Sequence, residues 1–144
     1  MSETVSEKVN AGLTFVQPEH FAAPKGYANG AITEGRLLHV GGQIGWNSQQ
    51  EFECSDFLGQ FAQALDNVLA VVEAAGGKAT DIASMTIFVT DLPAYRKAGK
   101  DLGPVWRARL GRHFPAMALL GVSGLVEEQA LVEILAVAVL GEKE

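Results

Sequence analysis

The residue whose surroundings most clearly indicate chemistry is Glu133, a carboxylate within the apolar stretch LVEILAVAV over residues 131–139. Burial of an unpaired carboxylate is costly. Glu133 is therefore either paired, or it serves as an acid, a base or a group that orients water. The alternative is structural, with the side chain reaching solvent at the end of a strand. The residues alone leave both interpretations open.

Three further residues could line a small-molecule site. Tyr27, between Gly26 and Ala28, could present its phenol to a cleft, or it could only close the edge of the core. Gly41 and Gly42 follow an expected strand, where glycines indicate a bulge or the close approach of another group to the backbone. The glycine spacing in this segment fits neither a phosphate-binding loop nor a dinucleotide-binding loop.

Metal and thiol chemistry are not indicated. The histidines His20, His39 and His113 lack metal-ligand spacing among themselves and with Cys54, so we expect no metal site. Cys54 has no cationic neighbour in the sequence and is expected to be an inert thiol. Arg112 and His113 could supply charge to a cleft, although a solvated helix end is the expected role of this pair.

The longest element that could position these groups runs from Ser55 to Gly77. Its apolar residues recur at helical spacing, which predicts an amphipathic helix lying on a β-sheet. Ser55 or Asp56 can cap its first turn, and Gly76 with Gly77 can end it. The opposite side of this helix is expected to face water, and it carries Gln63, Asp66, Asn67 and Glu73.

Strand patterns follow that helix. Residues 82–90 alternate and predict a strand, after which Asp91 can cap a second helix. Gly99, Gly103 and Pro104 lie within this helix, so we expect a kink or a break near Pro104. Residues 116–122 and 130–140 are expected to form the last two strands. The 130–140 segment is almost continuously apolar, so both faces of its sheet should be covered.

The N-terminal part is expected to be less regular. Residues 1–14 are predicted to be a flexible segment, and residues 13–26 an extended loop with two prolines. Residues 28–33 and 36–43 predict a hairpin that turns at Glu34 and Gly35.

Length and charge limit the possible classes of protein. With 144 residues and 48% hydrophobic content, one domain over residues 15–144 is expected. A net charge of −6 argues against nucleic-acid or anionic-membrane partners. The single cysteine and the absence of a signal-peptide pattern favour a cytoplasmic protein.

These elements predict an α+β fold with two helices on one face of a sheet. Two helices cover one face of a sheet of about four or five strands. We therefore expect the other face to be buried against another copy of the chain.

Several stretches, taken together, resemble the reactive-intermediate deaminase family, RidA/YjgF, also described as endoribonuclease L-PSP. The likeness extends from about Phe15 to Val139, in the family's order of elements. It rests on Gly26-Tyr27, VGGQIG (40–45), QALDNVLAVVEAAGG (63–77), TIFVTDL (86–92), FPAM (114–117) and VEILAVAV (132–139).

The resemblance implies a chorismate-mutase-like (ferredoxin-like) mixed sheet assembled as a homotrimer, with ligand clefts between subunits. The family's enzymes hydrolyse imines and enamines to carbonyl compounds and ammonia without a metal or organic cofactor. In them an arginine of an FPAR-type motif binds the substrate carboxylate, and a glutamate of the final strand orients the attacking water.

Matched residue by residue, the family's tyrosine becomes Tyr27 and its glutamate becomes Glu133. The strand-end backbone donors become Gly41 and Gly42, where a serine is common in the family. Met117 stands in the arginine position, which places the chain in an arginine-lacking subgroup and makes the substrate-binding wall more apolar.

Two functions follow as hypotheses. In the first, the chain is a cofactor-independent hydrolase of an enamine or imine resembling 2-aminomuconate, and not a 2-iminopropionate deaminase, because Met117 cannot bind a carboxylate. In the second, the trimer binds a metabolite or a partner protein without turnover. RNA cleavage, which is attached by name to some members of the family, is disfavoured by the acidic charge.

Overall fold

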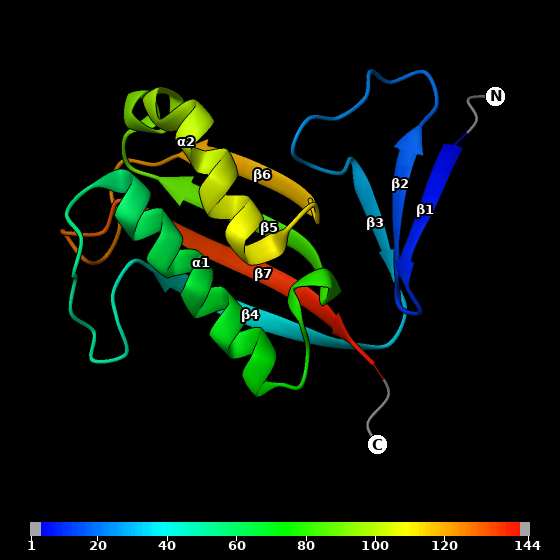
Figure 1. Ribbon diagram of the computed structural model, residues 1–144, viewed down its shortest axis with the longest axis horizontal. Coiled ribbons are helices and arrows are strands. Elements are labelled where there is room, and N and C mark those ends of the chain that lie inside the picture. Colours follow the sequence, from blue (N-terminus) through cyan, green and yellow to red (C-terminus); the bar gives the residue numbers. More distant parts are fainter. Residues whose placement is uncertain (1–3, 142–144) are drawn as a thin grey trace.

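In a computed structural model that describes residues 4–141, the chain folds into two helices packed on one face of a four-stranded sheet (Figure 1). The strand order is β4-β7-β5-β6, and only the β5–β6 pair is parallel. These strands are β4 (Arg36–Ile44), β5 (Ile82–Val89), β6 (Ala116–Gly121) and β7 (Val132–Leu140). The α+β class expected from the sequence is confirmed.

The first helix, α1 (Phe57–Ala74), forms where the apolar spacing predicts it. The carboxylate of Asp56 caps it by accepting a hydrogen bond from the Gly59 amide at 3.1 Å. Its apolar stripe packs on the sheet, and Leu65, Val68 and Val72 are fully buried. A short 3-10 turn, η1 (Ala79–Asp81), then leads into β5.

The second helix, α2 (Leu92–Leu110), begins at Asp91 as expected, with the carboxylate accepting from the Ala94 amide at 3.0 Å. Its break lies at Gly99 and not at Pro104. Proline clashes with the carbonyl four residues earlier, here that of Lys100, and gives it no hydrogen bond. The distortion therefore falls one turn before Pro104, where Gly99 adopts a non-helical conformation.

The N-terminal residues form a second sheet, order β1-β2-β3, which lies beside the first one (Figure 1). It consists of β1 (Thr4–Asn10), β2 (Leu13–Pro18) and β3 (Gly30–Thr33). The predictions of a flexible segment over residues 1–14 and of an extended loop over 13–26 are therefore wrong for residues 4–10 and 13–18. Residues 1–3 and 142–144 lie outside the described part of the chain.

The predicted hairpin over 28–33 and 36–43 is also wrong. Its two strands form, but β3 pairs with β2 and β4 pairs with β7. Glu34 and Gly35 instead make the corner between the two sheets, with Gly35 at a φ of 124°. The hairpin was predicted from residues 34 and 35 alone. The strand that actually pairs with β4 is β7, which lies about a hundred residues later in the sequence.

The small sheet is attached at one end of the large one. Leu13 of β2 packs against Ala83 and Val139, and all three side chains are at most 3% exposed. Asn10 adds hydrogen bonds from its amide nitrogen to the Thr80 carbonyl and the Asp81 carboxylate, both at 3.2 Å. These contacts join the small sheet to η1, to the start of β5 and to the end of β7.

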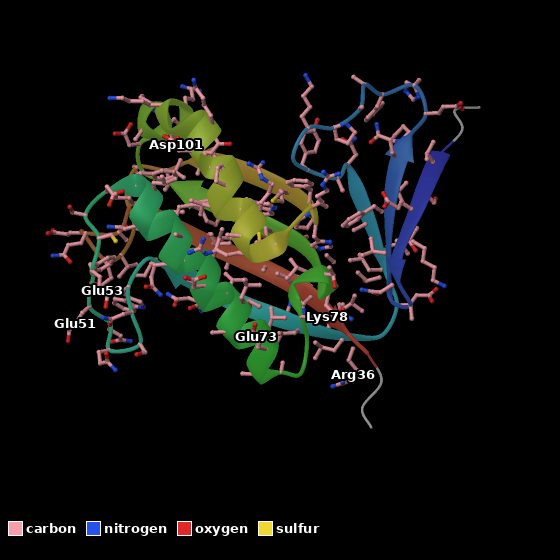
Figure 2. All side chains as sticks on the ribbon, in the orientation of Figure 1. Arg36, Glu51, Glu53, Glu73, Lys78 and Asp101 are labelled. Carbon is pink, nitrogen blue, oxygen red and sulfur yellow. The ribbon has the colours of Figure 1, made fainter. Side chains whose placement is uncertain are left out.

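The two faces of the large sheet differ. The helix-facing side carries the core, and side chains fill the layer beneath helices whose exposed residues include Glu73 and Asp101 (Figure 2). The opposite face is open in the single chain, and Leu37, Leu120 and Leu135 on it are 47%, 45% and 38% exposed. Its burial by another copy remains a prediction. Among the described helices, none is long and apolar enough to cross a membrane.

His113 is buried, although the sequence predicts a solvated helix end at this position. Only 7% of it is exposed, and its Nε2 lies 2.7 Å from the Ile82 carbonyl, so this nitrogen carries the proton. Burial lowers the pKa of His113, while the hydrogen bond to Ile82 and the charge of Asp81 oppose this shift. The histidine is therefore held neutral in the fold.

This burial predicts a pH-dependent stability. As the pH falls below 6.5, the ordinary pKa of histidine, the unfolded chain binds a proton at residue 113 more readily than the folded chain does. The free energy of unfolding should therefore drop between pH 7.5 and 5.5, and His113→Gln should show a smaller drop. Urea titrations at both pH values measure it. His20→Gln, at an exposed position after β2, should behave as wild type, and equal drops in all three proteins would contradict the account.

Candidate functional site

Glu133 lies on the open face of the large sheet. Its neighbours in β7, Val132 and Ile134, are fully buried toward the helices, and alternation along the strand directs Glu133 to the other side. It pairs with Phe88 of β5, which is in turn paired with Leu120 of β6. The carboxylate therefore rises from an apolar surface and is half-buried in the single chain.

Gly41 and Gly42 form the bulge that their glycine content indicates. The register between β4 and β7 shifts between Val40 and Gln43, so the ladder is interrupted at the two glycines. The Glu133 side chain lies against Gly42, since a methyl group built there would lie 2.8 Å from Cδ and 2.9 Å from Oε2 of Glu133. Only glycine leaves room for the carboxylate in this position.

Two polar residues of α1 hold the end of β4 in place. Asn67 donates from Nδ2 to the carbonyls of Ile44 and Trp46, at 2.9 and 2.8 Å. The expectation that Asn67 faces only water is therefore wrong. Gly45 lies directly on the helix, where a methyl group on it would be 2.6 Å from Cβ of Gln60.

Gln60 has a role at the site that the sequence did not predict. It is 1% exposed, and its Nε2 donates to the carbonyls of Cys54 and Gln129, at 3.2 and 2.9 Å. Its Oε1 accepts from the Leu131 amide at 2.8 Å, directly before β7 begins. A glutamine within an apolar stripe was the one available signal. Gln60 thus fixes the backbone that enters β7, and it packs against Gly45 directly after β4.

Tyr27 and Met117 belong to a different place, a cavity of about 310 Å³ beneath α2 at the edge of the sheet. Met117 of β6 pairs with Met85 and packs against the core on the helix-facing side. Tyr27 is set beside it because the Ala28 amide donates to the Pro115 carbonyl at 3.0 Å, next to the first residue of β6.

The sequence-predicted residues therefore form two groups that do not meet within one chain. Gly42 and Glu133 lie on the open face, whereas Tyr27 and Met117 line a cavity on the helix-facing side. Strand β5 separates β6 from β7, so Met117 and Glu133 are also two strand spacings apart, roughly 10 Å. A small ligand bound in one chain touches only one group.

The other candidate groups lie outside the Met117 cavity. Arg112 lines a separate cavity of about 770 Å³, between the small sheet and the end of α2. Tyr27 and Phe114 border both cavities. Within the described residues, no cluster of three or more histidine, cysteine, aspartate or glutamate side chains could hold a metal ion.

Comparison with known proteins assigns the fold to a family. A sequence model described as endoribonuclease L-PSP matches residues 18–140, most of the chain. The chain belongs to this family. It is the family that also carries the names RidA and YjgF, shortened to Rid.

Relatives within the Rid family agree in sequence and in structure. The chain is 33% identical to a RutC family protein of Haemophilus influenzae, over 76% of this chain and 83% of the relative. It is 35% identical to the 2-iminobutanoate/2-iminopropanoate deaminase of Escherichia coli K12, over 73% and 80%. Among solved structures, YyfB of Yersinia pestis aligns with a TM-score of 0.77 at 27% identity, over 90% of this chain and 99% of YyfB.

The fold is that of the family as well. The YjgF structure of Escherichia coli aligns with a TM-score of 0.64 at 34% identity, over 82% of this chain and 91% of YjgF. The chorismate-mutase-like arrangement of a mixed sheet with two helices on one face, expected from the resemblance, is therefore confirmed.

Alanine substitution at three glycines of the Rid strand end tests this geometry. Gly41→Ala should change neither stability nor Glu133, because nothing lies within 4 Å of the added methyl. Gly42→Ala should displace the Glu133 carboxylate at little cost in stability, because that side chain can rotate away. Gly45→Ala should destabilise the fold by about 1–3 kcal/mol, because the methyl meets the helix backbone.

Urea denaturation measures the stabilities, and the carboxyl carbon shift of Glu133 in NMR spectra reports its position. An unchanged Glu133 resonance in Gly42→Ala would contradict the contact between this glycine and the carboxylate.

Proposed function

We propose that the protein hydrolyses an imine or enamine to a carbonyl compound and ammonia, in a cleft formed between two copies of the chain. The observation that carries the proposal is the separation of the site residues onto opposite sides of one sheet. Each chain then carries two different half-sites. Glu133 and Gly42 form one on the open face of the sheet, and Tyr27 and Met117 form the other on the helix-facing side. A neighbouring copy would complete each half.

The open face of the sheet supports assembly. Leu120 and Leu135 expose much of their apolar surface near Glu133, and Leu37 does so further along the same face. Large apolar side chains exposed on one face of a sheet are typical of interfaces between subunits. A homotrimer, which resemblance to the family implies, would bury this face and bring the carboxylate to the rim of a neighbour's cavity.

The chemistry needs only a positioned water and a proton carrier. In hydrolysis, water adds to the C=N carbon to give a carbinolamine, and the nitrogen then leaves as ammonia while the C=O bond forms. Glu133 would take a proton from the attacking water and pass it to the imine nitrogen, which gives the carbinolamine. It would then pass the hydroxyl proton of the carbinolamine to the same nitrogen as the C–N bond breaks. An enamine first takes a proton on carbon. The backbone amides of the bulge at Gly41 and Gly42, together with the Tyr27 hydroxyl, would bind polar atoms of the substrate.

Met117 distinguishes this chain from the archetypal deaminases. A thioether cannot form the paired hydrogen bonds with which an arginine binds a carboxylate. We therefore propose a substrate larger than 2-iminopropionate, with 2-aminomuconate as the first compound to test. The same methionine favours a second candidate function, in which the cleft holds a metabolite or a partner without turnover.

Substitution of Glu133 separates the two functions. Glu133→Gln preserves the shape of the side chain and removes its base, so turnover of 2-aminomuconate should fall on the order of 10²- to 10⁴-fold. Ammonia release from freshly generated 2-aminomuconate and 2-iminopropionate measures it, and light scattering after size exclusion reports assembly. Glu128→Gln, at an exposed position of the loop before β7, is the matched control.

Turnover retained in Glu133→Gln would remove this residue from the mechanism. If the wild-type protein consumes neither compound but is thermally stabilised by one of them, binding without catalysis replaces the hydrolase proposal.

A further inference from the structure

The cavity that contains Met117 has one cationic side chain in its lining, Lys25. Lys25 is exposed, and it forms no ion pair with the described side chains of residues 5–141. It precedes Tyr27 by two residues, and Gly26 between them has a φ of 76°. Such a backbone favours glycine, and it helps to set Lys25 and Tyr27 on the border of one cavity.

The rest of the lining is largely aromatic and aliphatic. The rings of Trp106 and Phe114 lie 6.0 Å apart and are nearly parallel, at 7°. The Trp106 ring nitrogen already donates to the His113 carbonyl at 3.0 Å, so it offers no hydrogen bond to a ligand. Phe61 and Leu102 complete this apolar wall together with Met117.

Size and charge together indicate a class of ligand. Pockets for drug-sized ligands measure roughly 300–1,000 Å³, so a cavity of about 310 Å³ suits one ring or a branched chain. Arg112, which could also supply charge to a cleft, lines the neighbouring cavity and not this one. An anion that enters the Met117 cavity therefore meets Lys25.

We infer that Lys25 takes over the carboxylate-binding role at this site, and that the substrate carries a planar or branched apolar group that packs on Trp106, Phe114 and Met117. This inference rests on the proposed function and names the class of its substrate. An ammonium group is a point charge and does not fix the plane of a carboxylate as a guanidinium does. Orientation of the substrate then depends on the flat aromatic wall, which selects against small imino acids.

Stable ligands test the inference without catalysis. Phenylacetate and phenylacetamide have the same shape and differ in charge, and acetate lacks the ring. Isothermal titration of the wild-type protein should show phenylacetate binding more tightly than both others. Lys25→Met should weaken phenylacetate about three- to tenfold and leave phenylacetamide unchanged, since an exposed charge pair contributes modestly. Lys25→Arg should restore binding, and Lys97→Met, an exposed lysine of α2 outside the cavity, should have no effect.

Three results would overturn the inference: no measurable binding of phenylacetate, equal loss of both aromatic ligands in Lys25→Met, or acetate binding as tightly as phenylacetate. Turnover of the imines of phenylalanine and alanine, formed in solution by oxidation of the amino acids, is measured in parallel. Binding that depends on Lys25 without any turnover would uphold the inference and overturn the hydrolase proposal. If both imines are turned over equally well, and Lys25→Met does not change their turnover, the hydrolase proposal would be upheld and the inference about Lys25 overturned.

Discussion

The structure depends on the burial of one side of β7 beneath α1. Val132, Ile134, Ala136 and Ala138 alternate along this strand and are at most 3% exposed. Because β7 is paired with β4 on one edge and β5 on the other, its backbone polar groups are satisfied in the middle of the sheet. Because the apolar side of β7 packs against the helix, the alternation of side chains along the strand directs Glu133 to the open face. The position of the candidate catalytic carboxylate is thus a consequence of core packing.

The polar groups of α1 fix the backbone of the strands that carry the candidate site residues. Gln60 binds the backbone just before β7, and Asn67 binds the backbone at the end of β4. Both strands are therefore held to the same helix, with the glycine bulge of β4 beside Glu133. Buried amide groups with all partners satisfied give positional precision that apolar packing alone does not. A carboxylate meant to orient water needs such support.

Much of the fold follows from local patterns. The helix from Phe57 to Ala74 was predictable because its apolar spacing, its Asp56 cap and its glycine stop all lie within the segment. The partner of β4 was not, because β7 lies about a hundred residues later in the sequence. The kink in α2 was predicted one turn too late, since the proline acts on the carbonyl four residues before it.

The sequence could name candidate residues for the site but not their arrangement. The faces of Gly42, Met117 and Glu133 depend on strand register across the large sheet, and the place of Tyr27 depends on the bridge between Ala28 and Ala116. The role of Gln60 could not be predicted, because its hydrogen-bond partners lie in segments that only the folded chain brings to the helix. Lys25 lies on an irregular segment, where no periodicity indicates which cavity a side chain borders.

The central claim is that neighbouring copies each contribute half of a site, and mixing two inactive variants tests it most directly. Glu133→Gln lacks one half and Tyr27→Ala impairs the other. If the two are unfolded and reassembled together in equal amounts, about one quarter of the clefts should combine an intact Glu133 with an intact Tyr27 from a different chain. The account predicts recovery of about that fraction of wild-type turnover. A mixture that shows only the average of its two components would contradict a shared site.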